Sequence, residues 1–241
     1  MLKWVLFDWR NTLANSDLAV KKADEKQLNL KILTSFGFTI TKKEFIAARK
    51  IVDLNRKTIF KGNIKRHRKG AFFKDLLGVL GKQITWKHAE AMEDKYVREY
   101  DKLVTLMPGA IHTLTYLKKQ KVNISIISNT RKERLISQIN QTSAVNFVDL
   151  IITSVESKGE KSSLQPFSNF LQKINKIKPA KPSECIMIGD RADEDLHAKS
   201  IGFTTILFGK NTNRYTTEIA PDFIARDFKE VKKILATHFN S

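Results

Sequence analysis

The first hydrophobic segment of the chain ends abruptly in a carboxylate. Residues 4–7 are all apolar strand formers, and Asp8 follows them directly. A strand that is buried on both faces of a parallel sheet has such an uninterrupted apolar pattern. Ligands bind at the carboxyl ends of these strands, so Asp8 is placed either to attack an electrophile or to bind a hard cation. The alternative is that Asp8 only caps a following helix.

Helical periodicity replaces the strand pattern from residue 15 to residue 105, where no convincing strand occurs. The capping box formed by Thr41 and Glu44 marks the start of one helix in this segment. The expected helices are 18–36 (one helix or two), 41–54, 70–80 and 86–100. We therefore expect residues 15–105 to form an all-helical insert.

Strands and helices alternate regularly in the remainder of the chain. A helix is expected at 110–119, after the Pro108-Gly109 pair. The strands that follow are predicted at 122–127, 147–153, 185–188, 204–208 and, at a sheet edge, 223–225, with helices at 132–141, 166–177, 193–201 and 229–238. Single helices between strands predict right-handed crossovers and a doubly wound parallel sheet. The expected fold is thus an α/β core, residues 1–14 and 106–241, that carries the helical insert.

The chain is strongly basic, with 43 lysines and arginines against 25 acidic residues and a formal net charge of +18. Nucleic acid is therefore a possible partner. However, the lysines are dispersed, the densest basic run lies at 61–74, and no nucleic-acid-binding motif occurs. The favoured interpretation is a solvated basic surface, which would also steer an anionic small substrate towards the protein.

Neither a membrane span nor a signal peptide is expected. No apolar run approaches the roughly 20 residues that cross a bilayer, and Asp8 interrupts the apolar segment at the N-terminus. The single cysteine, Cys185, lies within an apolar run, so we expect it to be buried and to form no internal disulfide. These features predict a cytoplasmic protein.

Three predicted strands each end in a polar side chain, namely Asp8, Ser128 and Asp190. Because the carboxyl ends of parallel strands meet at one edge of a sheet, we expect these side chains to converge. Asp195 follows closely after Asp190, and the loop at 156–161 supplies lysines that can reach the same edge. Carboxylates from separate strand ends suit Mg²⁺, which takes few carboxylates together with phosphate oxygens.

Four stretches, at 7–13, 126–129, 154–161 and 188–195, resemble in order and spacing the four motifs of the haloacid dehalogenase-like hydrolase superfamily. The helical insert lies where that family carries its cap domain. Most members of the family are Mg²⁺-dependent phosphatases, so the resemblance implies a Rossmann-like core and hydrolase activity.

The resemblance also implies roles for individual residues. Asp8 would be the nucleophile and form an aspartyl-phosphate, and Ser128 with the backbone of Asn129 would hydrogen-bond the transferring phosphoryl group. Lys161 would neutralise charge on the nucleophile and the phosphate. Lys158 is an alternative to Lys161 within the same loop.

The metal ligands implied by the family are Asp8, Asp190 and the backbone carbonyl of Arg10. Asp195 would lie behind the metal or orient the lysine. The alternative for Asp195 is a helix cap or a solvent-facing side chain.

Two positions depart from the family pattern. Arg10 replaces the aspartate that protonates the leaving group and later activates water, and Ser162 replaces the proline that usually follows Lys161. Arginine cannot exchange a proton near pH 7, and general acid–base help contributes roughly 10²–10⁴ in rate. Asp17 and Glu25, from the start of the insert, are acids that could substitute.

The expected function is slow, Mg²⁺-dependent hydrolysis of a small phosphomonoester. Two alternatives remain open: a haloacid dehalogenase-type hydrolase, since that branch also lacks the second aspartate, and a catalytically weakened member that binds anions or nucleic acid.

We also expect the insert to lie over the strand ends and to move about its connections near residues 14 and 106.

Overall fold

The computed structural model describes residues 1–59, 62–210 and 218–238. The chain divides into two compact units, which we call the α/β unit (residues 1–16 and 105–241) and the helical unit (residues 17–104).

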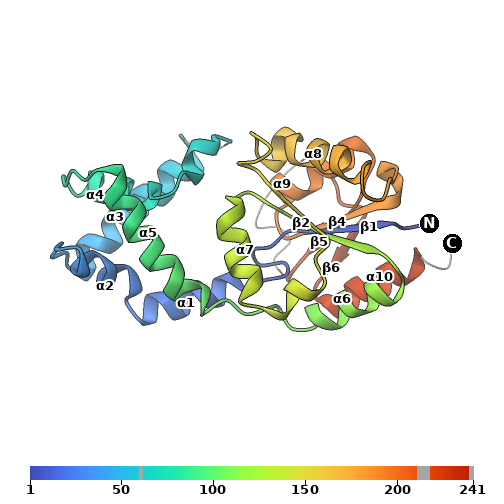
Figure 1. Ribbon diagram of the computed structural model, residues 1–241, viewed down its shortest axis with the longest axis horizontal. Helices are drawn as coiled ribbons and strands as arrows, with labels where there is room; N and C mark the ends of the chain where they lie inside the picture. Colours follow the sequence, from blue (N-terminus) through green and yellow to red (C-terminus); the bar gives the residue numbers. More distant parts are fainter. Residues whose placement is uncertain (60–61, 211–217, 239–241) are drawn as a thin grey trace. The chain divides into compact units, whose positions relative to one another are not determined.

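The α/β unit contains a six-stranded sheet in which all strand pairs are parallel, in the order β3-β2-β1-β4-β5-β6 (Figure 1). The strands are β1 (Trp4–Phe7), β2 (Asn123–Ser128), β3 (Leu150–Thr153), β4 (Cys185–Gly189), β5 (Thr204–Phe208) and β6 (Phe223–Ala225). The central strand β1 is fully buried, as its uninterrupted apolar pattern predicts. The doubly wound α/β fold predicted from the sequence is confirmed.

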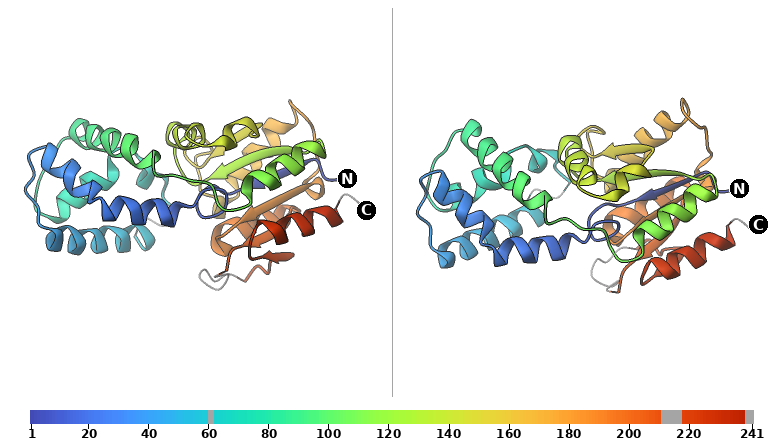
Figure 2. Two further views of the ribbon diagram at one scale, coloured as in Figure 1. Left: turned by 90° about the horizontal axis from the view of Figure 1, so that it is seen from below. Right: turned by 60° about the horizontal axis from the view of Figure 1, so that its bottom comes forward.

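Helices cover both faces of this sheet (Figure 2). They are α6 (Ala110–Lys119), α7 (Lys132–Asn140), α8 (Gln165–Ile174), α9 (Ala192–Asp195) and α10 (Phe228–Thr237), with short 3₁₀ segments that include η3 (Lys161–Ser163) and η5 (Leu196–Ile201). On one face Trp4 meets Phe170 of α8 edge to face, with ring centroids 5.4 Å apart. On the other face Phe228 of α10 contacts Phe7 and Phe208.

Several predicted elements differ from the structure at their ends, among them the helix expected at 166–177, which ends at Ile174. The strand expected at 147–153 begins only at Leu150, because a 3₁₀ segment (Ser143–Asn146) precedes it and Phe147, which ends that segment, has helical backbone angles. The helix expected at 193–201 is α-helical only to Asp195 and continues as the 3₁₀ segment η5. Such tightening of a helical segment is common near helix ends.

The strand register aligns the three predicted site segments. Phe7 pairs with Ile126 of β2 on one side and with Ile188 of β4 on the other. Asp8, Ser128 and Asp190 therefore leave the sheet at the same edge, although they are far apart in sequence.

The helical unit contains no strand among its described residues. Its helices are α1 (Ser16–Glu25, whose first residue belongs to the α/β unit), α2 (Leu28–Ser35), α3 (Lys42–Lys57), α4 (Ala71–Val79) and α5 (Trp86–Asp101), with the 3₁₀ turn η1 (Ile64–His67) between α3 and α4. The predicted capping box is present, since Thr41 accepts the N–H of Glu44 and donates its own N–H to the Glu44 carboxylate. The fully buried side chains Phe73, Leu76 and Met92 belong to its core.

Basic side chains of the 61–74 run contact groups of their own unit. The guanidinium of Arg68 lies 3.6 Å from the ring centre of Trp86, and Lys69 pairs with Asp94 at 2.6 Å. Lys61 lies outside the described residues. These contacts fit a folded, solvated basic face, and nucleic-acid binding stays a prediction.

Cys185 is buried in β4, as predicted. Across the described ranges, no helix combines the length and the apolar composition that a membrane span requires.

Candidate active site

Asp8 is held rigidly at the carboxyl end of β1. The backbone N–H of Asp8 donates to the carbonyl of Ile188 at 2.9 Å, and Asp8 is only 6% exposed. Burial raises the pKa of Asp8 to about 6, because a buried carboxylate loses hydration; Lys161 opposes this shift and Asp195 adds to it. Asp8 is therefore a buried side chain at the end of a strand, and its role as nucleophile or metal ligand stays a prediction.

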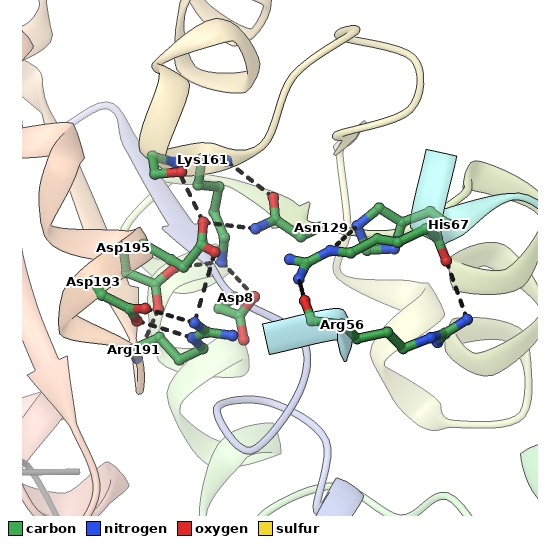
Figure 3. Close-up of polar contacts among 11 residues, drawn as sticks. Asp8, Arg56, His67, Asn129, Lys161, Arg191, Asp193 and Asp195 are labelled. Carbon is green, nitrogen blue, oxygen red and sulfur yellow. Dashed lines mark hydrogen bonds and ion pairs between the residues drawn. The ribbon is translucent and has the colours of Figure 1, made fainter. Parts of the chain in front are cut away.

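Lys161, the first residue of η3, lies between two carboxylates (Figure 3). Its Nζ is 2.7 Å from Oδ1 of Asp8 and also contacts Oδ1 of Asp195. Burial disfavours the ammonium charge, but the two carboxylates outweigh burial and raise the pKa of Lys161 above its ordinary value. Lys158, the alternative lysine, is exposed and has a left-handed backbone (φ 57°). The contact with Asp8 is therefore made by Lys161.

Asp8, Asp190 and Asp195 form a carboxylate cluster whose nearest oxygen atoms all lie within 4.8 Å of one another. Burial and the neighbouring charges of Asp8 and Asp195 raise the pKa of Asp190 to about 8. Asp195 is already engaged, because it pairs with Lys161 and accepts the backbone N–H of Arg191 at 3.0 Å. The oxygen atoms of Asp8 and Asp190 are hard donors that suit a divalent cation, and binding one would displace the proton that Asp190 holds below its raised pKa.

Gly189 makes this cluster possible. A Cβ atom at position 189 would lie 2.1 Å from Oδ2 of Asp195, far inside van der Waals contact. Only glycine at the end of β4 lets the carboxylate of Asp195 pack against the strand and reach Lys161.

The segment after β2 connects the other two strand ends. Ser128 is buried, and its carbonyl accepts the N–H groups of Thr130 and Ser154. The side-chain amide of Asn129 accepts the backbone N–H of Lys161 at 3.0 Å and donates to the carboxylate of Glu194 at 2.7 Å. The sequence predicted a role for the backbone of Asn129 and missed these side-chain contacts.

Arg10 is exposed in the turn that follows β1. Backbone hydrogen bonds close this turn, from Asn11 to Ala14 at 2.7 Å and from Ala14 to Trp9 at 2.8 Å. The side chain of Arg10 takes no part in them. Position 10 therefore lacks a carboxylate for proton transfer while its backbone geometry is independent of the arginine.

The candidate substitutes for that carboxylate, Asp17 and Glu25, are both exposed on α1. They lie eight positions apart on one helix, which corresponds to about 12 Å along the axis. They cannot both serve the same proton-transfer position.

Two buried residues near the site were not predicted from the sequence. Trp9, directly after Asp8, is almost fully buried. Its indole N–H donates to the side-chain oxygen of Gln138 on α7 at 2.8 Å. Glu194 is 2% exposed and contacts the loops after β2 and β3. The only sequence signal for Glu194 was indirect: Ser162, in place of the usual proline, has a backbone N–H to donate.

Comparisons with known proteins place the chain among enzymes of known kinds. The chain is 28% identical over 160 residues to the ribulose-1,5-bisphosphate 5-phosphatase of Halopiger xanaduensis, covering 66% of this chain and 65% of that enzyme. It thus spans slightly less than two thirds of that relative's length. It is 25% identical over 237 residues to the glyceraldehyde 3-phosphate phosphatase of Methanothermobacter thermautotrophicus, covering 97% of this chain and 96% of the relative.

Among solved structures, the hydrolase YfnB of Bacillus subtilis, crystallised with magnesium, matches with a TM-score of 0.73 at 19% identity, covering 98% of this chain and 99% of that chain. A likeness at this identity shows a shared fold. The sequence model of the haloacid dehalogenase-like hydrolases matches residues 5–208. Because this match includes all four strand-end segments of the site, the chain belongs to the haloacid dehalogenase-like hydrolase family.

Proposed function

We propose that the protein is a Mg²⁺-dependent phosphatase that hydrolyses a small phosphomonoester through an aspartyl-phosphate. The observation that carries this proposal is the buried carboxylate of Asp8 at a strand end, paired with Lys161 and adjacent to Asp190. In the first step an oxygen of Asp8 bonds to phosphorus and the substrate alkoxide leaves. In the second step water attacks phosphorus, inorganic phosphate leaves and the carboxylate is restored.

The residues around Asp8 supply charge and hydrogen bonds for these steps. Lys161, held at 2.7 Å from Asp8, offsets negative charge as the phosphoryl group approaches the carboxylate. Ser128 and the backbone N–H of Asn129 lie on the neighbouring strand end and would bind phosphoryl oxygens. Asp195 keeps the ammonium of Lys161 oriented between the two carboxylates.

Asp8, Asp190 and the backbone carbonyl of Arg10 would hold Mg²⁺. The fit follows from the donor set, since two closely spaced carboxylates with only partial neutralisation are hard oxygen ligands. When bound, Mg²⁺ offsets charge on the phosphoryl oxygens and on Asp8.

The similarity to two sugar-phosphate phosphatases supports a small phosphorylated substrate. The net charge of +18 would favour the approach of such an anion. A dehalogenase would work without metal, and a weakened binding protein would show salt-sensitive binding without turnover. Closure of residues 15–105 over the strand ends and a cytoplasmic location remain predictions.

The proposal is tested by a screen of p-nitrophenyl phosphate, sugar phosphates and phosphoglycolate, with Mg²⁺ or with EDTA. We expect phosphate release that needs Mg²⁺ and is abolished in the Asp8→Asn variant, because an amide cannot form the acyl-phosphate. With a substrate whose phosphoryl group carries a label, the aspartyl-phosphate should be recovered after acid quenching of the wild type. It should be absent from Asp8→Asn. Turnover of a 2-haloacid in EDTA, or phosphate release by Asp8→Asn at the wild-type rate, would refute the proposal.

Magnesium binding gives a separate prediction. Asp190→Asn should weaken Mg²⁺ affinity at least about tenfold, because the variant loses one of two charged ligands. Since the pKa of Asp190 lies near 8, Mg²⁺ must displace a proton, and wild-type affinity should increase between pH 6 and pH 8.5. Isothermal calorimetry measures both effects. Asp222→Asn, which removes a carboxylate paired with Lys199 elsewhere in the unit, is the matched control. Equal affinities for wild type and Asp190→Asn would exclude the proposed site.

A further inference from the structure

Glu194 is a buried carboxylate that takes no direct part in the chemistry proposed above. It is 2% exposed and lies in α9, after the end of β4. A carboxylate in such a position is costly unless several donors satisfy it. Its Oε2 accepts from the side chain of Asn129 at 2.7 Å and from the backbone N–H of Ser162 at 3.3 Å, and its Oε1 lies 3.7 Å from the guanidinium of Arg191.

These contacts connect three loops at the edge where the candidate site lies. Asn129 follows β2, Ser162 belongs to η3 after β3, and Glu194 follows β4. In the sheet, β2 and β4 lie on either side of β1, so the bond between Asn129 and Glu194 links the loops on either side of the strand that ends at Asp8. Asn129 extends the link, because its carbonyl oxygen accepts the backbone N–H of Lys161, as the dashed lines in Figure 3 show.

The contact between Ser162 and Glu194 depends on the residue type at position 162. A proline at position 162 has no backbone N–H and could not donate to Glu194. The same proline would restrict the backbone directly after Lys161. In this chain, the hydrogen bond from Ser162 to Glu194 constrains the backbone at that point instead.

We propose that Glu194 is a positioning residue: with Asn129 and the backbone of Ser162 it fixes Lys161 against Asp8. It acts through the loops, and touches neither the substrate nor the reacting atoms. Loss of its carboxylate would leave Asn129 and Ser162 without their shared acceptor. The ammonium of Lys161 would then occupy a wider range of positions around Asp8. A misplacement of about 1 Å costs roughly 10²-fold in rate.

The first test compares Glu194→Ala with Glu194→Gln, and follows amide hydrogen exchange of the segment 160–164 together with turnover of p-nitrophenyl phosphate. Glu194→Ala should speed exchange of the Lys161 and Ser162 amides and lower kcat about 10–100-fold with little change in KM. Glu194→Gln keeps an acceptor oxygen, so its amide exchange and its kcat should both be close to those of the wild type. Glu184→Ala, which removes a carboxylate that accepts the N–H of Lys181 at 2.8 Å, is the control and should change neither.

The second test is a double-mutant cycle on kcat with Ser162→Pro and Glu194→Ala. Both changes remove the same hydrogen bond, so their effects should be less than additive. Ser162→Ala keeps the N–H and should behave like the wild type. Fully additive effects would overturn the inferred link between the two residues.

The inference rests on the proposed function only for the turnover readout. If the wild type hydrolyses no phosphomonoester, the proposed function fails, and exchange of the 160–164 amides still decides the role of Glu194. Unchanged exchange in Glu194→Ala overturns the inference whether or not the protein is active. Faster exchange with unchanged kcat in an active enzyme also overturns it, because Glu194 would then stabilise the loop without positioning Lys161.

Discussion

Replacing Arg10 by aspartate should raise kcat for alkyl phosphomonoesters by about 10²-fold, the lower end of the range for general acid–base catalysis. Both chemical steps need a proton carrier, since the leaving alkoxide must be protonated and the attacking water must lose a proton. Arginine cannot perform either transfer near pH 7. Because the turn at residue 10 is closed by backbone hydrogen bonds, the substitution should not disturb the path of the chain.

The leaving group separates the two steps. p-Nitrophenolate needs no protonation, so the wild type should form the aspartyl-phosphate from p-nitrophenyl phosphate and then hydrolyse it slowly. Burst kinetics should show accumulation of the intermediate in the wild type and its loss in Arg10→Asp. The gain in kcat should be larger for an alkyl phosphate than for p-nitrophenyl phosphate.

Arg10→Ala is the matched control, because it removes the guanidinium without adding a carboxylate. An equal gain in Arg10→Ala would mean that the guanidinium inhibits and that proton transfer is not limiting. Asp17→Asn and Glu25→Gln test the two candidate acids on α1. If the wild type turns over both substrates rapidly, and none of these variants changes the rates, the proton-transfer argument is wrong.

Replacing Lys161 by methionine should destabilise the protein by about 3–5 kcal/mol at pH 8, the usual cost of removing one partner of a buried ion pair. Lys161 is the cation that contacts both Asp8 and Asp195, and its side chain is 3% exposed. The variant keeps these two carboxylates buried without that partner. Turnover should also fall by about 10²–10³-fold, as when one preorganised donor is removed from a transition state.

The loss of stability in Lys161→Met should depend on pH. Without the ammonium, the pKa of Asp8 rises above the value of about 6 that it has beside Lys161. A carboxyl whose pKa is higher in the folded than in the unfolded state favours folding at low pH, and this contribution is lost as pH rises through the folded-state pKa. The deficit should therefore be small near pH 5 and large at pH 8.

Thermal unfolding of wild type and variant between pH 5 and pH 8, without Mg²⁺, measures this dependence. Lys199→Met is the control, since Lys199 pairs with Asp222 at 2.7 Å on the surface and its loss should cost less than about 1 kcal/mol. A pH-independent deficit in Lys161→Met would mean that the destabilisation comes from packing and not from unpaired carboxylates.

The local features of this protein were readable from its sequence. A strand buried on both faces must be apolar throughout, so β1 and β4 appear as uninterrupted hydrophobic runs that end at Asp8 and Gly189. The capping box at Thr41 is equally local, since its two hydrogen bonds join residues three positions apart. Parallel pairing then requires the strand ends to meet at one edge, which is why Asp8 and Asp190 could be brought together before the structure was known.

Contacts between distant loops were decided only by the tertiary structure. Lys158 and Lys161 lie three residues apart in one loop. Only the packed fold buries Lys161 against Asp8 and leaves Lys158 exposed. The link between Asn129 and Glu194 spans 65 residues. Periodicity reports which face of an element is apolar, but it carries no information on which polar side chain a remote loop will supply. For that reason the sequence determined the strand-end carboxylates, while the bonds that hold Lys161 between them depend on the whole sheet being assembled.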